Sequence, residues 1–149
     1  MPNLDYKVVC GNSLLGVEKD LFNAHLFSDL EKLKPLFFKE TNPTKKEEYK
    51  KQIDKLISEI TSGHTEFDFK VYFSEVFHHK GGFDVVIANP PYVGQKGNKE
   101  LFIIFKRHLN WTNFYERKQD LYYYFIAQGI KILNNKAFLS YIIPPYFTT

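Results

Sequence analysis

Short runs of apolar residues alternate with longer stretches that repeat at helical spacing, which is the pattern of an α/β protein. Residues 6–10 form a β-branched run that stops at a Gly-Asn-Ser turn, so we expect a first strand there. Residues 83–88 are almost continuously apolar and predict a second strand that is buried on both faces. Residues 137–143 predict a third strand, which ends at two prolines.

The stretch between the first two predicted strands is polar and helical. Thr44 and Glu47 form a capping box, and the helix that they begin should end at Gly63. Its apolar positions recur on one face: Tyr49, Ile53, Leu56, Ile57 and Ile60. The opposite face carries lysines and glutamates of mixed sign, which favours a solvated surface over a stripe that binds DNA.

Two weaker patterns flank this helix. Ser28 and Glu31 form an earlier capping box, and Pro35 should kink or shorten the helix that follows it. In residues 67–73 the apolar side chains alternate with polar ones, so we expect a short extended segment there.

The last third of the chain predicts a loop, a helix and a strand. Residues 93–100 are rich in Gly, Lys and Asn and indicate a mobile loop. Residues 120–133 predict a helix with one apolar face, formed by Leu121, Phe125, Ile126, Ile130 and Leu133. Strand, helix and strand in this order predict a parallel βαβ unit, with strand 83–88 beside strand 137–143.

Composition excludes several classes of protein. A chain of 149 residues with 44% hydrophobic and 25% charged residues can bury a core. Its net charge of +3 does not by itself indicate a nucleic-acid partner. One cysteine, Cys10, excludes a disulfide framework, and the histidines lack the spacing of metal ligands, so we expect no metal. Without a signal sequence or a membrane-spanning run, the expected location is the cytoplasm.

The candidate chemistry lies directly after the second predicted strand, at the edge where open parallel sheets bind ligands. The motif there is Asn89, Pro90, Pro91 and Tyr92. The Asn89 amide oxygen and the Pro90 carbonyl could accept both N–H bonds of an amino group, which concentrates its lone pair toward a methyl donor. Tyr92 would stack on the flat ring, and a base must flip out of a duplex to reach such a pocket.

A rigid turn is the alternative interpretation of this motif, because Asn and Pro are common in turns for local reasons. The buried run before it and the glycine-rich loop after it favour a binding site instead.

Residues 83–93 resemble motif IV of the N6-adenine DNA methyltransferases, in the form found in type IIG restriction-modification enzymes. Other stretches resemble further family segments in the same order: 9–15 the motif III strand and turn, 73–77 the segment before Gly-Gly-Phe-Asp, 120–133 motif V with its helix, and 137–144 the next strand. Residues 1–149 would then be one partial catalytic domain, from motif III to the strand after motif V, with 17–65 as a helical insertion.

The resemblance also implies roles for individual residues. The motif at 89–92 would hold and stack the target adenine, and S-adenosyl-L-methionine (SAM) would supply the methyl group. Asn12 stands where relatives often have an Asp that contacts the adenine ring of SAM, and Ser13 would line the same edge. Double-stranded DNA is the implied partner.

The glycine-rich motif I of the family, and the acidic residue that binds the SAM ribose, should precede Tyr6 and are not in the chain. Gly81 and Gly82 do not replace motif I, because they enter a strand whereas a cofactor loop leaves one. We therefore expect a partial Rossmann-like fold whose parallel sheet lacks its first two strands, with an incomplete SAM site. A missing N-terminal part or a second chain would complete it, and this chain alone should be inactive.

Two other interpretations of the sequence remain open. Asn-Pro-Pro-Tyr also occurs in enzymes that methylate protein glutamine or guanine N2 of RNA, although the context here resembles the restriction-modification group. A non-catalytic fragment or remnant is the second alternative.

Overall fold

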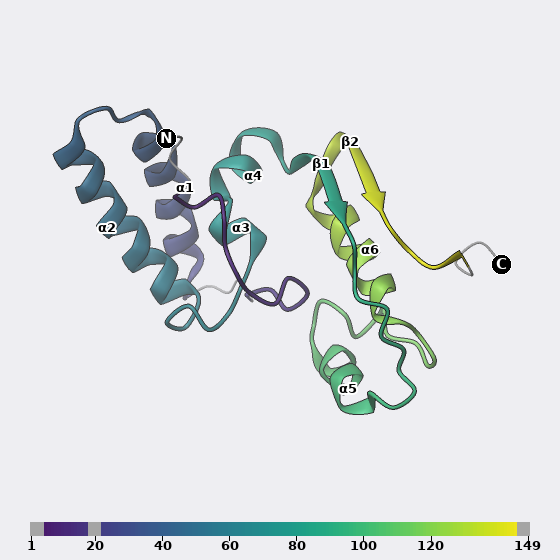
Figure 1. Cartoon of the computed structure of the whole chain (residues 1–149). Coiled ribbons are helices and arrows are strands. Elements are labelled where there is room, and N and C mark those ends of the chain that lie inside the picture. Colours follow the sequence, from purple (N-terminus) through teal and green to yellow (C-terminus); the bar gives the residue numbers. More distant parts are fainter. Residues whose placement is uncertain (1–4, 18–21, 146–149) are drawn as a thin grey trace. The chain divides into compact units, whose positions relative to one another are not determined.

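The computed structural model describes residues 5–17 and 22–145 of the chain. The chain forms two compact units that divide between Gly81 and Gly82. The first unit contains helices α1 to α4, and the second contains both strands with helices α5 and α6 (Figure 1). The predicted mixed α/β composition is therefore confirmed.

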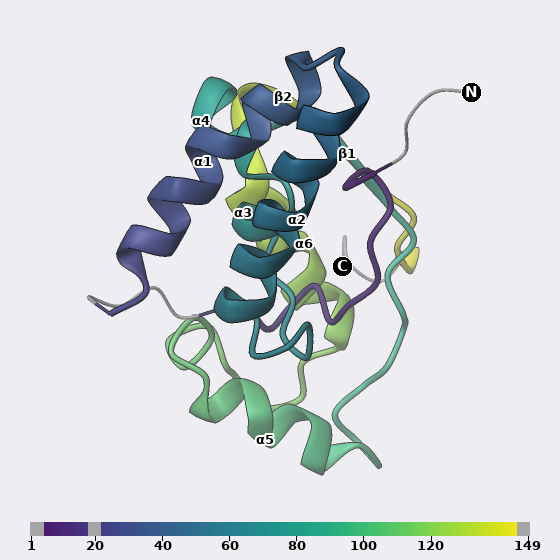
Figure 2. The same ribbon diagram turned by 90° about the vertical axis from the view of Figure 1, so that its left-hand side faces the viewer.

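The first unit is built on a helical hairpin. Helices α1 (Ala24–Lys39) and α2 (Pro43–Ile60) lie side by side in both views (Figures 1 and 2), and the short helices α3 (Phe69–Tyr72) and α4 (Ser74–Lys80) follow. Its core consists of Phe27, Leu30, Phe37, Ile53, Ile57, Ile60, Phe67, Val71 and Tyr72. The helical face predicted for α2 supplies three of these side chains, so its orientation is confirmed.

The predicted helix starts are wrong in detail. Asn42 caps α2, with its Oδ1 accepting from the backbone N–H groups of Thr44 and Lys45, so the cap lies two residues before Thr44. Helix α1 begins at Ala24 rather than at Ser28, and it continues past Pro35 to Lys39. Pro35 does not shorten α1 because the buried positions of the helix lie on both sides of it and hold it against the core.

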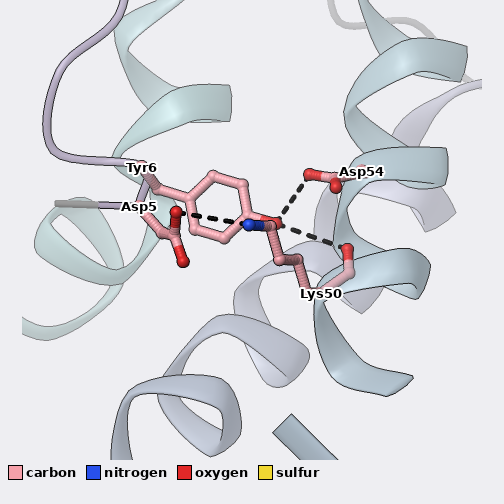
Figure 3. A network of polar contacts seen from close by, with 4 residues as sticks. All are labelled: Asp5, Tyr6, Lys50 and Asp54. Atoms are coloured by element: carbon pink, nitrogen blue, oxygen red, sulfur yellow. Dashed lines mark hydrogen bonds and ion pairs between the residues drawn. The ribbon is translucent and has the colours of Figure 1, made fainter. Parts of the chain in front are cut away.

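Residues 6–10 do not form the predicted first strand. The backbone of Tyr6 is left-handed, with φ of 61°, and its hydroxyl donates to Asp54 Oδ1 on α2 at 2.6 Å (Figure 3). Lys50 on the same helix lies 3.3 Å from Asp5, between Nζ and Oδ1 (Figure 3). A strand needs a neighbour for its backbone groups, whereas side-chain contacts with a helix hold this segment.

Residues 67–73 are not extended either. Asp68 Oδ1 accepts from the Lys70 backbone N–H at 2.7 Å and caps the single turn of α3. Val71 and Tyr72 are consecutive and both buried, which an alternating strand does not allow. The prediction was wrong because so short a run of alternating side chains does not distinguish a strand from a helical turn.

The second unit contains the predicted βαβ unit. Strands β1 (Phe83–Ala88) and β2 (Leu133–Tyr141) are parallel neighbours, joined through α6 (Leu121–Ile132). Val85 pairs with Phe138 and Ala88 with Tyr141, so the carboxyl ends of the two strands lie side by side. The predicted strand pairing and its parallel direction are confirmed.

Burial of the sheet differs from the prediction. The face of the sheet toward α6 is packed, because Leu139 and Tyr141 contact the helix at Gly129. The opposite face exposes large apolar side chains: Val85, Ile87, Phe138 and Ile142. The prediction that β1 is buried on both faces is wrong, since an apolar run shows that a strand can be buried but not what covers it.

Helix α5 (Lys99–Arg107) was not predicted, and it begins inside the expected loop 93–100. Helix α6 lies within the predicted range, and the predicted apolar face is correct at Leu121, which is buried. It is wrong at Ile130, which is 61% exposed, and at Leu133, which begins β2. The buried positions are Leu121, Tyr122, Tyr124, Gly129 and Ile132. These positions are buried because Tyr124 stacks on Phe105 and packs edge-on against Trp111, which fixes the rotation of α6 about its axis. The periodicity of apolar residues along the sequence does not reveal this aromatic cluster.

Candidate active site

The Asn89-Pro90-Pro91-Tyr92 motif follows β1 directly at the carboxyl edge of the sheet. Just beyond the end of β2, the backbone N–H of Ile142 donates to the Ala88 carbonyl at 3.1 Å, which extends the pairing of the two strands to the motif. The motif therefore begins on a part of the backbone that is fixed by the sheet.

Tyr92 is oriented by three contacts. Its Oη lies 2.8 Å from the Ile142 carbonyl oxygen and 3.1 Å from Asn89 Oδ1, within hydrogen-bond distance of both. Its ring meets the ring of Tyr122 edge-on, with centroids 6.5 Å apart and an interplanar angle of 86°. Half of Tyr92 is exposed, so the ring is anchored and still open to a ligand.

Asn89 is exposed, whereas Pro90 is buried. The prolines restrict the backbone after Asn89, and neither has an N–H group, so their polar backbone atoms are acceptors only. The arrangement places an amide, acceptor carbonyls and an open aromatic ring within four residues. Such a set can recognise a planar ring with an amino group.

Gln95 attaches the loop after Tyr92 to the segment that precedes α6. Its Oε1 accepts from the backbone N–H of Lys118 at 2.6 Å, and its Nε2 donates to Tyr115 Oη at 2.5 Å. Its own backbone N–H donates to the Gln119 carbonyl at 3.2 Å. The amide of one side chain thus ties together two loops that lie beside the motif.

Asn12 and Ser13 lie in the first unit, in a turn that follows the segment 6–10. Asn12 Oδ1 accepts from the Leu14 backbone N–H at 3.1 Å, which closes an Asx turn. Its Nδ2 remains as a donor for a ligand. The structure thus joins Asn89 with Tyr92, while Asn12 and Ser13 belong to a separate turn of the other unit.

Sequence reasoning missed several groups around the motif. Tyr122 lies in the segment 120–133 that resembles motif V, but the sequence pattern assigns no role to its ring, to the Ile142 carbonyl or to Gln95. The polar contact of Ile142 comes from its backbone, so no residue type could have signalled it. Gln95 had a weak signal, as a polar side chain three residues after the motif.

Charge is unevenly divided between the units. Residues 82–149 contain eight Lys and Arg and four Asp and Glu, a net charge of +4, while residues 1–81 have 12 basic and 13 acidic residues. Lys96, Arg117 and Lys118 are exposed on the two loops that Gln95 joins. The unit with the candidate motif is therefore the basic one.

No cluster of three or more His, Cys, Asp or Glu side chains suited to a metal ion occurs within residues 5–17 and 22–145. In that same part of the chain, no helix has the length and apolar character needed to cross a membrane.

The second unit is an α/β unit with the Asn-Pro-Pro-Tyr motif at the carboxyl edge of a parallel strand pair, and comparison with known proteins identifies the family of the chain. The family model described as Eco57I restriction-modification methylase matches residues 12–149, and the chain belongs to that family. Its members are methylases of restriction-modification systems.

One curated relative comes from Methanocaldococcus jannaschii and is named "Putative type II restriction enzyme and methyltransferase RM.MjaORFECS2P". It is 32% identical over 83 residues, which are 56% of this chain and 6% of the relative. The chain thus matches a small share of the length of that protein. No solved structure gives a significant match to the chain.

Proposed function

We propose that this chain carries the target-base site of a SAM-dependent DNA methyltransferase of the type IIG restriction-modification group, which methylates N6 of adenine. The observation that carries the proposal is the pair of Asn89 and Tyr92, linked through the Tyr92 hydroxyl at the carboxyl edge of β1. Family membership supports a DNA-modifying methyltransferase. On this proposal residues 1–149 belong to one catalytic domain, and residues 17–65 are an insertion in it.

The amino group of adenine is a poor nucleophile because its lone pair is delocalised into the ring. Asn89 Oδ1 and the Pro90 carbonyl would each accept one of its N–H bonds, which favours the pyramidal amine and localises the lone pair. The proton can leave after methyl transfer, so the reaction needs no strong base in the site.

Tyr92 would hold the base by stacking, a contact worth about 1 to 3 kcal/mol per base in other proteins. Contacts with Tyr122 and with the Ile142 carbonyl hold the Tyr92 ring in one orientation, and the ring is half-exposed, so a flat ligand can stack on it. A base in a duplex is out of reach of such a ring, so the proposal includes flipping of the target adenine.

SAM would contribute an electrophilic methyl group when bound. The residues present fit only one edge of this cofactor: Asn12 Nδ2 can donate to a ring nitrogen, and Ser13 adds a hydroxyl. Because Asn12 Oδ1 is engaged with Leu14, Asn12 would act as a donor, whereas an Asp at that position would act as an acceptor. We expect this chain alone to bind SAM weakly or not at all, which calorimetric titration tests.

The main test compares Asn89→Ala with Tyr92→Ala in the complete methyltransferase, with its SAM-binding segment present. Single-turnover methylation is measured on an adenine-containing duplex, and 2-aminopurine at the target position reports flipping. Asn89→Ala should lower the methyl-transfer rate by about two to four powers of ten with little change in DNA affinity. Tyr92→Ala should instead weaken retention of the flipped base.

Asn113→Ala, at an exposed asparagine in the same unit, is the matched control and should leave both signals unchanged. Near-normal turnover in Asn89→Ala would remove the motif from the chemistry. Methylation of RNA or of a protein glutamine in preference to DNA would replace the proposed substrate by one of the two related classes. Absence of SAM binding and of turnover in the complete protein would favour a non-catalytic role.

A further inference from the structure

The Tyr92 hydroxyl contacts two groups that both present an oxygen. Its Oη lies 2.8 Å from the Ile142 carbonyl oxygen and 3.1 Å from Asn89 Oδ1. A tyrosine hydroxyl has one proton to donate and lone pairs that can accept. One proton cannot serve two acceptors fully, so one of the two contacts is weak in this arrangement.

The Ile142 carbonyl can only accept and is the nearer of the two oxygens, so it retains the proton. The Asn89 carboxamide has an alternative, because a half turn about its Cβ–Cγ bond exchanges Oδ1 and Nδ2. With Nδ2 toward Tyr92, the amide donates to Oη while the hydroxyl donates to Ile142. All three groups then have a partner.

We propose that the Tyr92 hydroxyl is a positioning group that sets the orientation of the Asn89 amide. In this series of hydrogen bonds, the Asn89 amide donates to the Tyr92 hydroxyl and that hydroxyl donates to the Ile142 carbonyl. Asn89 Oδ1 then points away from the hydroxyl and keeps both lone pairs for the target amine. A donating Nδ2 also polarises the amide, which makes Oδ1 a better acceptor. This inference rests on the proposed function and adds to it a role for the Tyr92 hydroxyl, which acts through Asn89.

Stacking and positioning require different parts of Tyr92, so one substitution separates them. Tyr92→Phe keeps the ring and removes the hydroxyl. The matched control is Tyr141→Phe, because the Tyr141 hydroxyl also donates to a backbone carbonyl, that of Phe125 at 3.1 Å, but on the α6 side of the sheet. Both substitutions therefore remove a hydrogen bond from a hydroxyl to a backbone carbonyl, and only Tyr92→Phe also removes the contact with Asn89.

In the complete methyltransferase, Tyr92→Phe should lower the single-turnover rate about tenfold, the effect of one hydrogen bond that orients a catalytic group. The 2-aminopurine signal should stay at its wild-type level, and Tyr141→Phe should retain the wild-type rate. In an Asn89→Ala background, Tyr92→Phe should have no further effect, because the group that the hydroxyl orients is gone.

A second measurement does not depend on turnover. With ¹⁵N-labelled asparagine, the side-chain amide signal of Asn89 is identified by its loss in Asn89→Ala. We expect this signal to shift in Tyr92→Phe, as the amide loses its acceptor, and to stay in place in Tyr141→Phe.

A wild-type rate in Tyr92→Phe, an equal loss in the Asn89→Ala background, or an unmoved Asn89 signal would each overturn the positioning role. A wild-type rate in Asn89→Ala would instead overturn the proposed function itself. The two failures are distinguishable, because only the second leaves Asn89 dispensable.

Discussion

Lys34 on α1 and Glu75 on α4 form an ion pair inside the helical unit, with Nζ 3.2 Å from Oε2. Lys34 is fully buried, and its Nζ also donates to the Tyr72 carbonyl. Burial lowers the pKa of Lys34, although Glu75 acts in the opposite direction. The charge is therefore held in an unfavourable environment by partners from neighbouring elements.

Removing one partner of this ion pair should destabilise the folded protein. Glu75→Gln leaves the Lys34 charge buried without its carboxylate, and we expect a loss of about 3 kcal/mol in the free energy of unfolding. The double variant Lys34→Met/Glu75→Leu should recover most of that loss, which urea denaturation measures. Glu59→Gln is the control, because its pair with Lys55 is exposed and should contribute less than about 1 kcal/mol. Equal losses in both single variants would contradict the buried-charge explanation.

The aromatic cluster of the second unit should be sensitive to alkaline pH. Burial raises the pKa of Tyr124 to about 12, with Tyr115 as a smaller cause. The folded state then holds this proton more tightly than the unfolded state, so the stability it contributes is present below pH ~10 and is lost as pH rises from there through about 12. Absorbance titration of the phenols, with urea denaturation at each pH, should show this step, and Tyr124→Phe should lack it. A step that persists in Tyr124→Phe would assign it to another group.

Gly129 should be required for the contact between α6 and β2. A Cβ at this position would lie 2.7 Å from Leu139 Cδ1 and against the Tyr141 hydroxyl. We expect Gly129→Ala to destabilise the protein by about 1 to 3 kcal/mol, even though Ala favours a helix by about 1 kcal/mol. Leu139→Ala should relieve part of the overlap, so the double variant should lose less than the sum of the single losses. A gain of stability in Gly129→Ala would show that the helix and sheet are more loosely packed than we describe.

The basic loops should contact the DNA backbone if the proposed function holds. Lys96→Gln and Arg117→Gln should each weaken DNA binding similarly for all sequences and reduce the slope of log K against log salt by about 1. Lys51→Gln, on the mixed-charge face of α2, is the control and should leave the slope unchanged. Binding measured by fluorescence anisotropy over a salt series provides the comparison. A change confined to one base sequence would indicate base readout instead.

By itself the sequence determined the elements whose signals are local. The apolar run 83–88, the repeat in α2 and the extent of α6 each follow from side chains that are close along the chain. The position of the Asn-Pro-Pro-Tyr motif directly after a strand follows in the same way.

Only the tertiary structure decided which residues these elements contact. The Ile142 carbonyl reaches Tyr92 across 50 positions, the aromatic cluster sets the buried face of α6, and contacts with α2 replace pairing at residues 6–10. None of these three contacts can be predicted from neighbouring residues in the sequence. A backbone carbonyl is the same in every residue, and an apolar pattern does not specify which side chains it packs against. The sequence thus predicts which residue types form the site, and the tertiary structure provides the contacts that orient them.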